Sequence, residues 1–139
     1  MAVRLSTGLK NFALDSGLAT AFDGGTGRIN VYTGTQPATA DTAASGTLLA
    51  TLTINTDSFA AASSGAIVMN SATSGTAVAT GTAGYVRFYR TGDTAPASAG
   101  NGTTDRRLDL LIATDISIDN ASVVTGGTVA LSGYTLTHA

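Results

Sequence analysis

Apolar residues alternate with small or polar ones along much of this chain, and this period of two constrains the fold more than any other feature. Residues 28–32 place Ile29 and Val31 on one face, and residues 47–54 carry an apolar side chain at every second position. A period of two is that of a β-strand, in which successive side chains point to opposite faces of a sheet. The pattern therefore predicts half-buried strands.

The same alternation returns at intervals toward the C-terminus. Further strands are expected, in chain order, at Ala66–Met69, Thr82–Arg90 and Arg106–Thr114, with a short extension at 116–118 and a terminal hairpin over 122–137. About seven strands with turns at this spacing predict a mainly β chain that folds as a single antiparallel β-sandwich, immunoglobulin-like or jelly-roll-like. Thr33–Gly46 and Thr91–Thr104 are rich in small and polar residues and predict long loops, the second of them exposed.

Composition argues against helices, with one exception near the N-terminus. The chain has no glutamate and a single lysine, two residue types that usually cover exposed helical faces. Only the segment after Ser6 has helical spacing of apolar residues, and Gly17 is expected to end this short helix. A second helical turn is the further expectation for Leu18–Phe22, before residues 23–25 break any regular element. We therefore expect an N-terminal arm with a short helix over residues 1–26, followed by a β-sandwich domain over residues 27–139.

The charge balance speaks against several classes of partner. The formal net charge is −2 and 12% of the residues are charged, so the basic surface that nucleic-acid binding requires is not expected. No apolar run approaches the roughly 20 residues that span a bilayer, and no signal peptide is recognisable. We expect a protein made in a cytoplasm that binds neither nucleic acid nor membrane.

Catalytic chemistry has little support in the sequence. The single histidine, His138, is the penultimate residue, where a catalytic imidazole would lack a fixed partner. Asp105 and Asp109 would share a strand face, but residues four apart on a strand lie about 13 Å from each other, too far for a carboxylate pair. The prediction is a protein that is not an enzyme and needs no cofactor.

A calcium site is the one metal site worth considering. Asp115, Asp119 and Asn120 carry oxygen ligands close together in the sequence at an expected strand-to-turn transition. Aspartate and asparagine are also ordinary turn residues that bond to nearby backbone groups. We expect no metal, and keep these three residues as weak candidates.

Residues 85–89 suggest a binding face. Tyr85, Arg87 and Tyr89 fall on one side of the expected strand, and tyrosine and arginine are enriched at interface hot spots. An exposed tyrosine pair could also stack on sugar rings. The alternative is that the tyrosines simply cover the sheet while Arg87 extends its charged end to solvent.

Three parts of the chain together resemble a group of small proteins encoded among the structural genes of tailed bacteriophages and prophages. The residues that carry this resemblance are Met1–Leu9, Ile29–Pro37 continuing to Gly46–Ala50, and Thr82–Tyr89. The resemblance extends in order over nearly the whole chain, and it implies a virion-associated role with no catalytic residue.

This resemblance leads to the expectation of a phage structural protein located in the virion. A capsid decoration, or cement, protein is the first hypothesis: it would bind the major capsid protein or other virion proteins through repeated contacts, and form a homo-oligomer in the particle. The candidate interface residues on the N-terminal arm are Leu9, Phe12, Leu14 and Phe22. Packing of these side chains against their own sheet is the alternative. A tail, connector or baseplate component and a glycan- or receptor-binding module are the competing functions.

Overall fold

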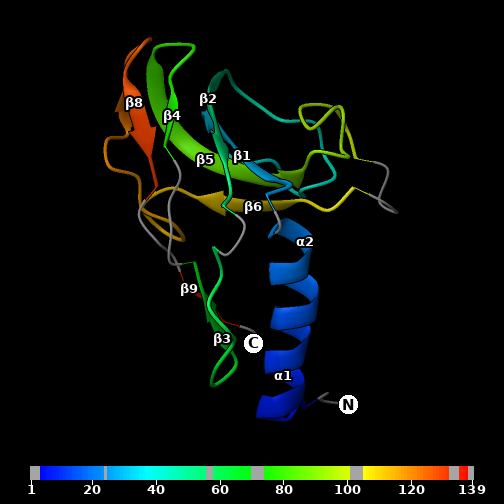
Figure 1. Cartoon of the computed structure of the whole chain (residues 1–139). Helices are drawn as coiled ribbons and strands as arrows, with labels where there is room; N and C mark the ends of the chain where they lie inside the picture. Colours follow the sequence, from blue (N-terminus) through cyan, green and yellow to red (C-terminus); the bar gives the residue numbers. More distant parts are fainter. Residues whose placement is uncertain are drawn as a thin grey trace.

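A computed structural model describes residues 4–23, 25–55, 58–69, 74–100, 105–131 and 135–137 of the chain. It confirms a mainly β fold with antiparallel strand pairing and one helical segment at the N-terminus (Figure 1). The strands are β1 (Gly27–Thr33), β2 (Leu48–Thr53), β3 (Ala66–Val68), β4 (Ser74–Thr76), β5 (Gly81–Arg90), β6 (Leu108–Leu111), β7 (Ser122–Val123), β8 (Thr128–Ala130) and β9 (Thr135–Thr137).

The longest strands form one open sheet. Its order is β2-β1-β5-β6, and the short β7 pairs with the beginning of β5. Two separate ribbons, β3-β9 and β4-β8, complete the strand pairing among the described residues. A single sandwich of about seven strands is therefore not confirmed, because the strands after β6 are only two or three residues long and pair with scattered partners.

The expected terminal hairpin is wrong. A turn does connect β7 and β8, but β7 pairs with β5 while β8 pairs with β4, and β9 pairs with β3. The turn still closes locally, since the Gly127 amide donates to the Val124 carbonyl at 2.9 Å. Sequence pattern identified the strands, whereas the choice of partner depended on segments more than 40 positions away in the chain.

The N-terminal helix is continuous where a break at Gly17 was predicted, and it ends at Phe22, where the predicted second turn ends. It consists of α1 (Thr7–Ala13), a π-helical segment η1 (Leu14–Ala19) and α2 (Thr20–Phe22), which follow one another as a single rod in Figure 1. Ser6 caps its start as expected, accepting a hydrogen bond from the Leu9 amide. Gly17 does not end the helix, because a terminating glycine adopts a positive φ and Gly17 does not.

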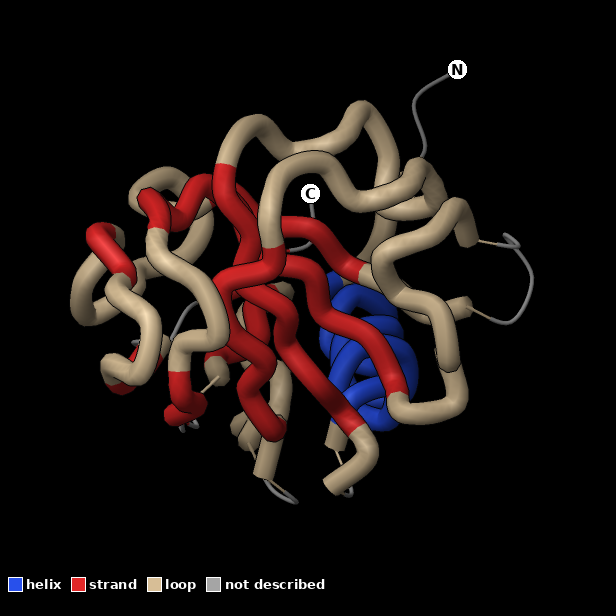
Figure 2. Tube along the Cα trace, turned by 90° about the horizontal axis from the view of Figure 1, so that it is seen from above, coloured by secondary structure: helices blue, strands red, loops and turns tan. Residues whose placement is uncertain are grey.

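The two faces of the main sheet differ in chemistry. On one face, Ile29 lies opposite Phe88 and Val31 opposite Val86, and all four side chains are buried. The helix covers this face, with the rings of Phe22 and Phe88 in edge-to-face contact at 5.7 Å. Figure 2 shows the helix on one side of the strands. We call this side the apolar face and the opposite side the polar face.

None of the helices that the structure describes is long and apolar enough to cross a membrane.

Candidate functional site

The centre of the polar face is a row of three polar residues on adjacent strands. Asn30 on β1 lies opposite Arg87 on β5, which lies opposite Asp109 on β6. Arg87 binds the Asp109 carboxylate with two parallel hydrogen bonds, Nε to Oδ1 at 2.8 Å and Nη2 to Oδ2 at 2.7 Å. Such a bidentate pair is stronger and more directional than an ordinary ion pair. The row is thus a fixed part of the sheet.

Arg87 also connects the sheet to the two loops above it. Its Nη1 donates to the Pro96 carbonyl and its Nη2 to the Thr42 carbonyl, both at 3.0 Å. Its side chain is 0% exposed, and the hydrogen bonds to Asp109 raise the pKa of the guanidinium despite burial. Arg87 is therefore a charged anchor for loops that come from two distant parts of the chain.

The tyrosines of the polar face pack beneath the same loops. Tyr32 and Tyr85 stack with ring centroids 5.3 Å apart. The Tyr85 hydroxyl donates to the Ser45 carbonyl at 2.9 Å and accepts from the Ser45 amide at 3.0 Å. Burial raises the pKa of Tyr85, so its hydroxyl stays protonated and keeps both bonds over a wide pH range.

These contacts correct the expectation of an exposed binding face. Tyr85 and Arg87 are both 0% exposed, and only Tyr89 is half-buried at the edge of the loops. Burial raises the pKa of Tyr89 as well. Arg87 does not extend to solvent either, because the loops bring carbonyl acceptors to it. The described part of the chain offers no exposed tyrosine pair on this strand for stacking on a sugar.

The loop Thr91–Thr104, predicted to be exposed, is pinned to the sheet over its described part. Arg107 binds Asp93 through Nε to Oδ2 at 2.5 Å and Nη2 to Oδ1 at 3.0 Å, and donates to the Ser98 and Ala95 carbonyls. Most described residues of the loop are exposed, as predicted, but Asp93 is buried. Residues 101–104 lie outside the described residues.

Electrostatics favours the closed loop at neutral pH. Burial raises the pKa of Asp93, but the hydrogen bonds from Arg107 and from the Ala95 amide outweigh it, and the pKa lies below the usual value. Arg107 also lies 3.5 Å from a carboxylate oxygen of Asp105. Asp105 and Asp109, considered above as a carboxylate pair, thus neutralise two different arginines.

The candidate interface residues of the arm separate into two groups. Leu14 and Phe22 belong to the core, as the alternative hypothesis expected. Leu9 is 50% exposed and Phe12 is 66% exposed, and both lie on α1. The arm therefore presents only its outer half to a partner, while the inner half holds it to the sheet.

The helix is attached to the segment before β3 by polar side chains. Asn11 accepts a hydrogen bond from the Gly65 amide at 2.7 Å, and Asp15 accepts one from the Ala62 amide at 2.6 Å. Asp23 accepts a third from the Ser58 amide. Three side-chain oxygens, one from an amide and two from carboxylates, thus accept hydrogen bonds from backbone amides that have no strand partner. Leu9 and Phe12 are consequently held on a supported helix.

The weak metal candidates act as turn residues. Asp115 accepts the Leu111 amide at 2.9 Å, Asp119 the Ala130 amide at 3.1 Å and Asn120 the Ser122 amide at 3.0 Å. Each of the three side chains thus accepts a hydrogen bond from a different backbone segment. No group of three metal-ligating acidic, histidine or cysteine side chains occurs in the described ranges. His138 lies outside them.

Sequence reasoning missed the two arginine anchors. Arg87 was predicted to lie on an exposed face or to extend to solvent, and no role was predicted for Arg107, although Asp109 and Asp93 lie on the adjoining strand and loop. The sequence did contain a signal, because Arg107 and Asp109 alternate with Leu108 and Leu110 on a strand. When both faces of a sheet are covered, charged residues at such positions need partners.

Comparison with known proteins identifies no relative. No protein-family model matches the chain. Neither the curated proteins nor the solved structures contain a significant match.

Proposed function

We propose that this protein is a non-enzymatic structural component of a tailed-bacteriophage virion, and specifically a decoration protein of the capsid shell. The observation that carries the proposal is the exposure of Leu9 and Phe12, two large apolar side chains less than one turn apart on a helix whose other side is bound to the protein. Exposed apolar side chains grouped on a supported element are typical of interaction sites.

The rest of the molecule suits this role. The loops of the polar face are fixed by Arg87 and Arg107, so a copy bound to a shell would lose little conformational freedom on binding. Low charge limits repulsion between crowded copies. The proposal requires a rigid β body and does not depend on whether the sheet and ribbons amount to a two-sheet sandwich.

Many weak contacts repeated over a symmetric shell can replace one tight contact. A standard protein interface buries about 1,600 Å² in total, and the two side chains on α1 supply only its apolar centre. We expect the major capsid protein to provide the other half, with neighbouring copies of this chain adding contacts between them in the particle.

The first test is the copy number in gradient-purified particles, measured by quantitative mass spectrometry against the major capsid protein. A ratio near one, or a simple fraction such as a third, supports decoration of the shell. A handful of copies would instead assign the protein to the tail, connector or baseplate, and absence from clean particles would contradict a structural role.

The arm is tested with Phe12→Asp. Because Phe12 is 66% exposed, this change should leave the melting temperature nearly unchanged while abolishing incorporation into particles. Val124→Asp is the matched control, since Val124 is 61% exposed and lies away from the helix. Equal incorporation of both variants, or unfolding of the Phe12 variant, would disprove the role of the arm.

We do not propose the glycan-binding alternative, because two of the three side chains on which it depended are buried beneath the loops.

A further inference from the structure

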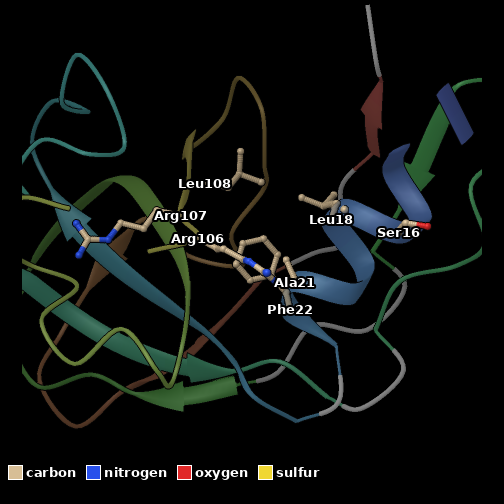
Figure 3. Close-up of a pocket in the computed structure, with 8 residues that line it drawn as sticks. Ser16, Leu18, Ala21, Phe22, Arg106, Arg107 and Leu108 are labelled. Carbon is tan, nitrogen blue, oxygen red and sulfur yellow. The ribbon is translucent and has the colours of Figure 1, made fainter. Parts of the chain in front are cut away.

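An open groove lies between the helix and the beginning of β6. Its volume is about 460 Å³. The helix contributes Gly17, Leu18, Ala21 and Phe22, and the β6 side contributes Arg106 and Leu108. Figure 3 shows Leu18, Ala21 and Phe22 of the helix facing the same space as Arg106 and Leu108. The groove is distinct from the Leu9 and Phe12 surface, which lies toward the other end of the rod.

The floor of the groove is apolar and the helix leaves room above it. Phe22 is buried in the core, and Leu18 and Leu108 are half-buried, so each shows part of its apolar surface. Gly17 adds no side chain, and a Cβ built there would meet nothing within 4 Å. A glycine inside a helix is less favourable than an alanine, so this space is kept at some expense of stability.

The helix is also irregular at this point. Gly17 lies within the π-helical segment Leu14–Ala19, where the Thr20 amide bonds to the Asp15 and Gly17 carbonyls. The Thr20 hydroxyl adds a bond to the Asp15 carbonyl at 3.1 Å. Single π turns inside α-helices are rare and are frequent at functional sites.

The Arg106 cation at this groove has no ion-pair partner among the described residues. Arg107 is 1% exposed and bound to Asp93 and Asp105, whereas Arg106 is exposed and makes no ion pair or hydrogen bond with any residue the structure describes. In Figure 3 the Arg106 side chain lies beside Ala21 and Phe22, while the Arg107 guanidinium points away from them. Adjacent arginines thus have different surroundings.

We infer that this groove binds a segment of another virion protein that carries an apolar side chain beside a carboxylate, with the apolar group over Phe22 and Gly17 and the carboxylate on Arg106. Charge complementarity selects the acidic partner. The open shape favours a polypeptide segment over a small molecule, because small-molecule sites usually enclose about 70–90% of the ligand surface.

A second copy of this chain fits the groove less well. Apart from Asp41, every described aspartate already accepts a hydrogen bond or forms an ion pair within the chain. Asp41 is flanked by Ala40 and Thr42 and has no large apolar side chain beside it. The inference rests on the proposed function for the class of partner, and on the groove itself for the chemistry.

The decisive experiment uses Arg106→Lys and capsid shells assembled without this protein. The variant keeps the charge, and a carbodiimide joins its new amine to a carboxylate in direct contact, forming an amide with loss of water. The only other lysine is Lys10, so crosslinked peptides are simple to assign by mass spectrometry. We expect a crosslink from position 106 to an aspartate or glutamate beside an apolar residue of another virion protein.

Binding measurements on the same shells test the groove itself. Gly17→Leu should weaken binding about a hundredfold by filling the groove, and Arg106→Glu about tenfold by placing like charges together. Gly92→Leu is the control, because a Cβ at Gly92 also meets nothing within 4 Å and that residue lies in the loop after β5. Melting curves establish that each variant folds.

The outcomes separate this inference from the proposed function. If the wild-type protein fails to bind shells or particles, both fall. If it binds and the groove variants bind equally well, the inference alone is wrong. A crosslink from position 106 only to another copy of this chain would also overturn it, as would bound protein with no crosslink at that position.

Discussion

The two faces of the main sheet are both buried along its centre, at β1 and β5, but they are covered by different means. Ile29, Val86 and Phe88 on the apolar face contact the helix and the core, whereas Asn30 and Arg87 on the polar face lie under loops. The apolar contacts are non-directional and need only matching volume. The polar contacts need each donor to meet an acceptor at the correct angle and distance.

Irregular loops can cover one face of a sheet without a second apolar core when buried side chains bind their backbone carbonyls. Arg87 and Arg107 donate to carbonyls of Thr42, Pro96, Ala95 and Ser98, and so satisfy backbone groups that no strand pairs. The loops also bond to each other, through the Ala44 amide to the Ala97 carbonyl at 2.8 Å. The loops are therefore part of the folded body.

The largest effect should come from breaking the central pair on the polar face. Asp109→Ala leaves the Arg87 charge buried without its carboxylate, and should lower the free energy of unfolding by about 3–5 kcal/mol. Urea denaturation measures this loss. The double variant Arg87→Met with Asp109→Leu should be clearly more stable than Asp109→Ala, and a double variant that is less stable would contradict the ion-pair explanation.

A cavity on the apolar face should cost somewhat less. Ile29→Ala removes three buried carbons opposite Phe88 and should lower the free energy of unfolding by about 3 kcal/mol. Ile29→Val should cost about 1 kcal/mol, because the apolar face tolerates small changes of volume. If Ile29→Val destabilises as much as Ile29→Ala, contacts on the apolar face do not depend on volume in the way described above. The contrast with the directional contacts of the polar face would then be wrong.

Acid should weaken the polar face before the apolar one. The pKa of Asp93 is lowered in the folded protein, so its contribution is complete above the unfolded value near 3.8 and is lost as the pH falls through the lower folded value. The Ala95 amide, which donates to Asp93 Oδ1, should lose protection relative to its intrinsic exchange rate as the pH falls below about 3.8, while amides of β1 and β5 stay protected. Simultaneous loss of protection everywhere would refute the local effect.

The smallest effect is expected for one hydroxyl. Tyr85→Phe keeps the stacking on Tyr32 but loses both hydrogen bonds to Ser45, and should cost about 1–2 kcal/mol. The Ser45 amide should then exchange faster than in the wild-type protein. Tyr32→Phe is the comparison, since its hydroxyl accepts from Asn30 on the sheet and does not hold a loop.

Much of the fold was accessible from local pattern alone. Alternation identified β1, β2 and β5 nearly to their observed limits, because side chains on a strand alternate between its faces whatever lies above them. It also located β6, but the predicted strand Arg106–Thr114 is longer than the observed Leu108–Leu111. Ser6 marked the start of the helix for an equally local reason. The end of the helix at Phe22 was also expected locally, whereas its continuation through Gly17 was not.

The candidate site was less accessible. Leu9 and Phe12 were identified together with Leu14 and Phe22, because helical spacing shows which residues are apolar but cannot show which side of the rod meets the sheet. The groove at Gly17 and Arg106 was not foreseen. It exists only because the helix lies beside β6, about 90 positions later in the chain.

The β-rich character and the position of the main strands can be predicted from the sequence, because side-chain chemistry and backbone sterics act within a few residues. The absence of common catalytic motifs from the sequence is equally local. Three features depend on tertiary structure: Tyr85 and Arg87 are buried, and β7, β8 and β9 pair apart from one another. The third is that Arg107 is bound to Asp93 while Arg106 forms no ion pair with a described residue. Burial and pairing are set by whichever distant segment supplies the missing hydrogen-bond partners and apolar area, and no local pattern records that choice.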